Sequence, residues 1–183
     1  VSFNLVKSLA ETGKRVVLVD ADIRKSVLFS RHQPDKVVNG LSHYLAGLEK
    51  LDNILCQTNI KNVYMIFAGK SVPNPSELLS SSKFSAMIAS LKKVFDYIII
   101  DCPPLGAVID AAVIASHADG AVMVIENNRI SYKTAQKIKG QLSKSGCRIL
   151  GAVLNKVDLD KKGYYGKYSG YYGHYGGYYG GEE

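Results

Sequence analysis

Apolar residues follow two different spacings along the chain. In five short segments they are nearly continuous rather than alternating, which is typical of strands buried on both faces in a helix-covered parallel sheet. These segments are 15–19, 63–67, 97–100, 121–125 and 149–154. Around them, apolar residues recur every three or four positions, which predicts amphipathic helices. The helical patterns cover 3–10, 41–48, 84–95, 111–115 and 132–142.

The order of these segments predicts the fold class. Strands alternate with helices along the chain, an order that favours an α/β fold with a doubly wound parallel sheet and right-handed crossovers. Gly13 lies where the first helix should end, because glycine commonly follows a helix in a left-handed conformation. With 183 residues, 46% of them hydrophobic, the chain is long enough to bury one sizeable core.

Acidic residues follow two of the predicted strands. Asp20 and Asp22 come directly after the first strand, and Asp101 follows the third. Ligands of such folds bind at the carboxyl ends of the strands, and Mg²⁺ is usually held there by one or two carboxylates together with substrate phosphates. Asp20 or Asp22 taken singly is better explained by a turn-capping role. Together, the three carboxylates predict a nucleotide and metal site.

Composition argues against several kinds of site and limits the kinds of partner. The three cysteines lack CxxC spacing and the histidines are scattered, which argues against a disulfide framework or a zinc site and favours a reducing compartment. No run approaches the roughly 20 apolar residues needed to cross a bilayer. The net charge of +7 favours an acidic partner such as a polyphosphate, a nucleic acid or an anionic membrane face, without choosing among them.

Two motifs resemble those of the bacterial tyrosine kinases that control capsule and exopolysaccharide synthesis. Residues 17–24, VLVDADIR, are similar to the Walker A-prime motif of that family, and residues 98–104, IIIDCPP, to its Walker B motif. Residues 69–79 also resemble a segment typical of the family. The resemblance implies a P-loop NTPase fold related to the partition and division-site ATPases, with ATP and Mg²⁺ as cofactors.

The resemblance also implies roles for individual residues. Asp20 and Asp22 would act around Mg²⁺ and the incoming tyrosine, with Asp20 as the base, and Asp101 would hold the metal through water. Independently of the resemblance, Arg24 follows the paired aspartates, a position from which we expect it to contact phosphate or a neighbouring subunit. Asn155 and Lys156, by analogy with Asn-Lys-x-Asp motifs, would lie beside the adenine, although a plain turn after the strand explains them equally well.

The composition changes abruptly after residue 162. Glycine and eight tyrosines dominate residues 163–181, which contain no aliphatic side chain, so a flexible tail that forms no core is expected. We therefore divide the chain into a kinase domain, 1–160, and a tyrosine-rich autophosphorylation tail, 161–183. A self-associating or RNA-stacking segment is the alternative. The expected phosphoacceptors are Tyr164, Tyr165, Tyr168, Tyr171, Tyr172, Tyr175, Tyr178 and Tyr179.

The chain departs from the family pattern at its start. No G-x-x-x-x-G-K-[ST] loop, which would cradle the phosphates, is present. In the family that loop lies directly before a helix resembling residues 1–5, so we expect the loop, and an N-terminal strand of the kinase domain, to precede Val1 in the full-length protein. Without it, the chain as given should lack activity. A genuine pseudokinase is the alternative.

The implied function is transfer of the ATP γ-phosphoryl group to tyrosines of a neighbouring copy, regulating polysaccharide synthesis. Implied partners are a membrane-embedded polysaccharide co-polymerase that acts as activator, further copies in a ring, and a cognate tyrosine phosphatase, with no nucleic acid. The expected location is the cytoplasm, at the inner face of the plasma membrane. Two alternatives stay open: a partition or division-site ATPase switch that binds membrane or DNA, and a non-enzymatic scaffold. The eight tyrosines favour the kinase.

Overall fold

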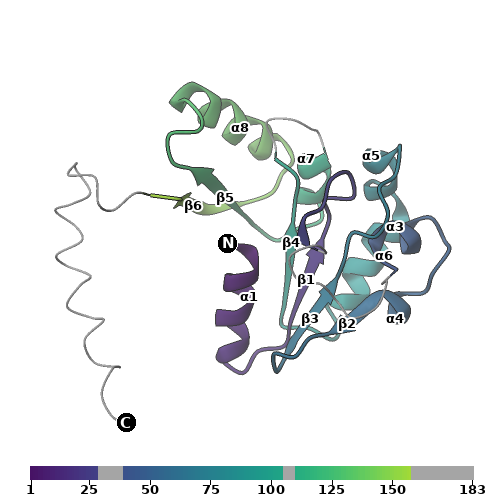
Figure 1. Cartoon of the computed structure of the whole chain (residues 1–183). Helices are drawn as coiled ribbons and strands as arrows, with labels where there is room; N and C mark the ends of the chain where they lie inside the picture. Colours follow the sequence, from purple (N-terminus) through teal and green to yellow (C-terminus); the bar gives the residue numbers. More distant parts are fainter. Residues whose placement is uncertain (29–38, 105–109, 158–183) are drawn as a thin grey trace, which may run out of the picture.

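The computed structural model describes residues 1–28, 39–104 and 110–157 (Figure 1). Its helices are α1 (Ser2–Glu11), α3 (Leu41–Leu45), α4 (Leu51–Ile54), α5 (Pro75–Leu79), α6 (Ser82–Leu91), α7 (Asp110–Ala115) and α8 (Tyr132–Lys144). Its strands are β1 (Val16–Asp20), β2 (Leu55–Gln57), β3 (Val63–Ile66), β4 (Tyr97–Asp101), β5 (Ala121–Glu126) and β6 (Ile149–Asn155).

A four-stranded sheet in the order β2-β3-β1-β4 carries the core. β1 runs parallel to both β3 and β4, whereas β2 is an antiparallel edge strand. Every residue of β1 is buried, because strands flank it on both sides and helices cover both of its faces. The expected parallel sheet is thereby confirmed in its central part.

The two faces of this sheet pack against different helices. Val16 and Leu18 of β1 point into a cluster with Val6 and Ala10 of α1. The alternate residues Val17 and Val19 belong to a larger cluster with α3, α6 and α7. Figure 1 shows α1 on one side of β1 and α6 on the other. This alternation along one strand is what a doubly wound α/β fold requires.

β5 and β6 form a separate parallel pair beside α8 (Figure 1). Here the expectation of burial on both faces is wrong: Val124 is 50% exposed and Leu150 62% exposed. Among the described residues these strands pair only with each other, and their buried cluster forms around Leu142 of α8. In the chain as given, β5 therefore exposes apolar side chains on one face and β6 exposes them on both.

Most of the expected elements are present, with shifted ends. The helix expected over 41–48 ends at Leu45, two residues before Gly47, which has a φ of 80°. The helix expected over 84–95 begins at Ser82 and ends at Leu91. Three short elements, α4, α5 and β2, were not predicted. Within the described ranges, no helix combines the length and the apolar character that a membrane span needs.

Candidate active site

The carboxyl ends of β1 and β4 bring two of the predicted carboxylates together. Asp20 and Asp101 are register partners in these adjacent parallel strands. The amide N–H of Ala21 donates to the Asp101 carbonyl at 2.9 Å, which fixes the two strand ends to each other. Asp22 follows two residues later on the same loop. The carboxylates thus gather at the edge of the sheet where ligands of α/β folds bind.

Asp20 is a buried carboxylate, only 1% exposed. The Ser26 hydroxyl donates to its Oδ2 atom, and the Asp22 N–H donates to Oδ1 at 3.2 Å. Burial raises the pKa of Asp20 from 3.8 to about 6, and the negative charges of Asp101 and Asp22 add to the rise, which the two hydrogen bonds oppose. A cation beside Asp20 would relieve both the burial cost and the repulsion.

Asp22 shapes the loop that follows β1. Its Oδ1 atom accepts the backbone N–H of Arg24 at 3.3 Å and that of Lys25 at 3.0 Å. This is the turn-capping role that the sequence left open for Asp22. Because both bonds use one carboxylate oxygen, the turn also sets the direction in which the other oxygen points.

Asp101 contacts a residue that the sequence analysis did not single out. The Ser2 hydroxyl, at the first position of α1, donates to Asp101 Oδ1 at 2.5 Å. The amino end of α1 therefore lies beside the end of β4. The sequence did contain a signal for Ser2. It is a serine at the start of a helix, directly after the position where a phosphate-binding loop is expected.

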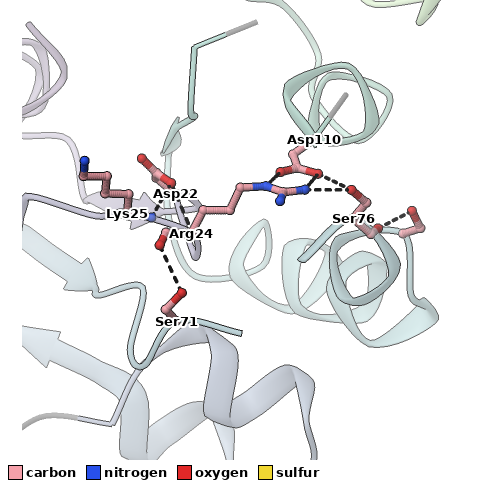
Figure 2. A network of polar contacts seen from close by, with 7 residues as sticks. Asp22, Arg24, Lys25, Ser71, Ser76 and Asp110 are labelled. Carbon is pink, nitrogen blue, oxygen red and sulfur yellow. Dashed lines mark hydrogen bonds and ion pairs between the residues drawn. The ribbon is translucent and has the colours of Figure 1, made fainter. Parts of the chain in front are cut away.

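Arg24 points away from the carboxylate cluster, toward α7 (Figure 2). Its Nε atom donates to Asp110 Oδ2 at 2.5 Å and its Nη2 atom to Oδ1 at 3.2 Å. The guanidinium holds the pKa of Asp110 below its usual range, and the Ser76 hydroxyl bond acts in the same direction. Sequence analysis missed Asp110 and Ser76, since they lie 86 and 52 residues from Arg24.

The remaining predicted residues lie elsewhere. Asn155 ends β6, opposite Glu126 of β5, and its carbonyl accepts the Asn127 N–H at 2.9 Å. The Lys156 ammonium forms an ion pair with Glu126 at 3.0 Å. Both belong to the β5–β6 pair and not to the sheet that carries Asp20. The eight predicted acceptor tyrosines, Tyr164 to Tyr179, lie outside the described residues.

The carboxylates do not form a metal cage. Across residues 1–28, 39–104 and 110–157, no group of three or more His, Cys, Asp or Glu side chains is arranged to hold a metal ion. Mg²⁺ does not need one, because it keeps several waters and takes one or two carboxylates plus substrate phosphates. Asp20 and Asp101, hard oxygen donors at neighbouring strand ends, fit that mode of binding.

This fold and its carboxylate edge define the class of nucleotide-binding P-loop ATPases. A family model described as "AAA domain" matches residues 1–150. The chain is 43% identical over 169 residues to the tyrosine-protein kinase CpsD of Streptococcus agalactiae, covering 91% of this chain and 74% of the relative. It belongs to the family of bacterial tyrosine-protein kinases.

Solved structures agree with this assignment. The kinase domain of the Escherichia coli tyrosine kinase ETK superposes with a TM-score of 0.79 at 27% identity, over 86% of this chain and 63% of that one. The septum site-determining protein MinD of Pyrococcus horikoshii, complexed with Mg-ADP, superposes with a TM-score of 0.73 at 29% identity, over 87% and 65% of the two chains.

Proposed function

We propose that this protein is an ATP-dependent tyrosine kinase that phosphorylates the tyrosines of residues 164–179 in a neighbouring copy. The observation that carries the proposal is the pairing of Asp20 with Asp101 at adjacent strand ends. It occurs in a chain that belongs to a family named for tyrosine kinase activity and that contains its own tyrosine cluster.

Asp20, Asp22 and Asp101 are proposed to hold Mg²⁺, which when bound neutralises charge on the phosphates. Asp20 is also suited to accept the tyrosine proton. Its carboxylate is mostly ionised at neutral pH, because its pKa of about 6 in the ligand-free protein lies below 7 and a bound cation would lower that pKa. Since a tyrosine hydroxyl has a pKa near 10, a base next to the acceptor favours its reaction.

A cavity beside the Asp22 loop offers a place for the acceptor side chain. It has a volume of about 290 Å³ and is lined by the loops after β1 and β3, including Ile23, Ser26, Ala68 and Gly69. Ligand pockets generally span ~300–1,000 Å³, so this cavity suits a single side chain better than a whole nucleotide. Ser26, on its wall, donates to Asp20.

The finer assignments extend the family resemblance. Asn155 and Lys156 would contact the base of ATP, and the regulated process would be capsule or exopolysaccharide synthesis. The partners would be a membrane-embedded activator that keeps the kinase at the inner face of the plasma membrane, further copies in a ring, and a tyrosine phosphatase. These assignments are proposals for the full-length protein.

The test uses a polypeptide in which a G-x-x-x-x-G-K-[ST] loop precedes Val1. Asp101→Asn should lower phosphotyrosine formation on residues 164–179 by orders of magnitude, because a metal-positioning charge is lost while the side chain keeps its size. Asp119→Asn is the matched control, since Asp119 is exposed and forms its ion pair with Lys92, away from the carboxylate edge. Tail labelling of Asp101→Asn at the wild-type rate would contradict the role of Asp101.

An ATPase switch is the second candidate, favoured by the similarity to a MinD protein complexed with Mg-ADP. Such a switch would hydrolyse ATP without labelling any tyrosine. Phosphate release that persists in the same polypeptide lacking residues 163–183, with no phosphotyrosine in the intact one, would favour the switch over the kinase.

A further inference from the structure

We propose that Arg24, Ser76 and Asp110, here called the Arg24 clamp, are positioning residues that hold the Asp22 carboxylate in its working direction. The inference rests on the proposed function, because it concerns how that site is kept in shape. The proposal assigns Arg24 a structural partner within its own chain, in place of the phosphate or subunit contact expected from the sequence.

The clamp joins three separate parts of the chain (Figure 2). Arg24 lies on the loop after β1, Ser76 in the first turn of α5, and Asp110 at the start of α7. The guanidinium meets Asp110 through two atoms, Nε at 2.5 Å and Nη2 at 3.2 Å. Nη2 also contacts the Ser76 hydroxyl at 3.3 Å, and that hydroxyl donates to Asp110 Oδ1. Two parallel N–H···O bonds to one carboxylate fix direction as well as distance.

The buried carboxylate of Asp110 requires the other two residues of the clamp as partners. Asp110 is fully buried, at 0% exposure, whereas the Arg24 side chain is 41% exposed. A buried carboxylate is tolerated only where its charge is paired and hydrogen-bonded. Arg24 and Ser76 supply that pairing, so the loop after β1 is held against α7 by the requirement to satisfy Asp110.

The main chain of Arg24 carries this constraint to Asp22. The Arg24 N–H donates to Asp22 Oδ1, and the Arg24 carbonyl accepts the Ser71 hydroxyl at 3.0 Å. The residue is thus held by its side chain on one side of the loop and by its backbone on the other. If the side-chain contact is lost, the N–H that orients Asp22 is free to move.

The contacts of the Arg24 guanidinium also argue against direct phosphate binding by this residue. Two of the guanidinium nitrogens, Nε and Nη2, are engaged by Asp110 and Ser76. Reaching a phosphate with this bidentate edge would leave the buried Asp110 charge without its cation. Arg24 therefore affects the reaction by orienting the Asp22 carboxylate. Asp110 contributes to the same orientation because it holds Arg24, although Asp110 lies on α7.

The experiment compares Arg24→Ala, Asp110→Asn and the double variant in the polypeptide with the added phosphate-binding loop. Loss of a group that orients a metal-binding carboxylate typically lowers activity or metal affinity ~10–100-fold. We expect each single variant to lower kcat by that factor and to raise the Mg²⁺ concentration for half-maximal rate, with a small change in KM for ATP. The double variant should be no worse than either single variant, because both break one unit.

Direct binding gives a readout independent of turnover. The affinity for Mn-ADP, followed by the paramagnetic signal of free Mn²⁺, should fall ~10–100-fold in all three variants. Lys92→Ala, which breaks the exposed Lys92–Asp119 ion pair at 2.7 Å, is the matched control and should bind like the wild type. Ser76→Ala should show a smaller loss, because the ion pair itself remains.

Two results would overturn the clamp. One is a raised KM for ATP in Arg24→Ala alone, with Asp110→Asn unchanged, which would make Arg24 a phosphate ligand. The other is unchanged Mn-ADP affinity in both single variants. A wild-type protein that binds Mn-ADP but labels no tyrosine would refute the kinase proposal instead, and the clamp would still be judged by the binding measurements.

Discussion

At the scale of single residues, Asp20 lies among groups that make its negative charge costly. Its folded pKa of about 6 exceeds its ordinary value of 3.8 mainly because the side chain is buried. Since the folded state holds this proton more tightly than the unfolded state, protonation of Asp20 stabilises the fold below about pH 4. That contribution is lost as the pH rises through about 6. The shift of roughly two pKa units corresponds to at most about 3 kcal/mol.

Replacing Asp20 should therefore stabilise the ligand-free protein. Asp20→Asn is expected to raise the free energy of unfolding at pH 7.5 by about 1–3 kcal/mol, because the amide carries no charge. Its oxygen can still accept the Asp22 N–H, and the Ser26 hydroxyl can turn to accept from the amide NH2 group. Tyrosine phosphorylation should be lost. The measurement is urea unfolding of both proteins at pH 7.5 and at pH 4.5, where the difference should shrink. An equal difference at the two pH values would show that the charge of Asp20 is not its cause.

The sequence predicted which residues lie together only where the order of the strands brings them to the same edge of the sheet. Asp20 and Asp101 follow adjacent parallel strands, and the carboxyl ends of such strands meet at one edge. The Arg24–Asp110 contact has no comparable rule behind it. It depends on how α7 packs against a loop that lies 86 positions earlier in the chain. The sequence around Asp110 shows only the start of a short helix.

At the scale of elements, a close backbone approach joins α3 to the end of β3. The Leu41 N–H donates to the Phe67 carbonyl at 2.7 Å, and the Ser42 N–H to the Ala68 carbonyl at 2.9 Å. A Cβ atom on Gly40 would lie 2.3 Å from the Phe67 oxygen and 2.4 Å from the Gly69 nitrogen. Only glycine permits this approach, which shapes one wall of the candidate site.

Gly40→Ala should consequently lower the free energy of unfolding by about 1–3 kcal/mol, since backbone atoms must shift to admit the methyl group. Gly140→Ala is the matched substitution. Gly140 lies inside α8, and a Cβ atom there would meet nothing within 4 Å, so alanine should raise stability by about 0.5–1 kcal/mol through its helix propensity. Urea unfolding distinguishes the two, and a Gly40→Ala protein as stable as the wild type would refute the close approach.

The spacing of apolar residues predicted some helices and strands better than others. β1 was predicted well because its apolar run is bounded by charged and turn residues and is buried on both faces. α4, α5 and β2 are three to five residues long, too short to display a period. β5 and β6 carry the same apolar character as β1, yet their faces are partly exposed. Sequence composition reports what a strand could bury, whereas its neighbours decide what it does bury.

At the scale of the whole molecule, phosphorylation of the tail is expected to change the net charge and thereby the association of copies. The chain starts at +7, and each phosphotyrosine adds about −1.5 to −2 at neutral pH, so eight would add roughly −12 to −16. The net charge would change sign. An unphosphorylated tail can enter the site of a neighbouring copy, whereas a phosphorylated tail would be repelled by the carboxylates of that site once metal and nucleotide have left.

We therefore expect transfer between copies, followed by weaker assembly. The test mixes an inactive Asp20→Asn protein that carries the tail with an active protein lacking residues 163–183, and follows phosphotyrosine and oligomer size together. The inactive partner should become labelled, and the oligomer should shrink as labelling proceeds. Labelling restricted to tails on active copies would refute transfer between copies. An oligomer unchanged by full phosphorylation would refute the charge switch.

The separation of β5 and β6 from the main sheet has a consequence for motion. Proteins open in cooperative parts of unequal stability, and the parts with the least buried apolar surface open first. The β5–β6 pair, with Leu150 and Val124 in solvent, belongs to the easily opened class, whereas fully buried β1 belongs to the most resistant. In the chain as given, hydrogen exchange should therefore be fast in β5 and β6 and slow in β1, so that the Asp20–Asp101 edge stays folded while this pair opens.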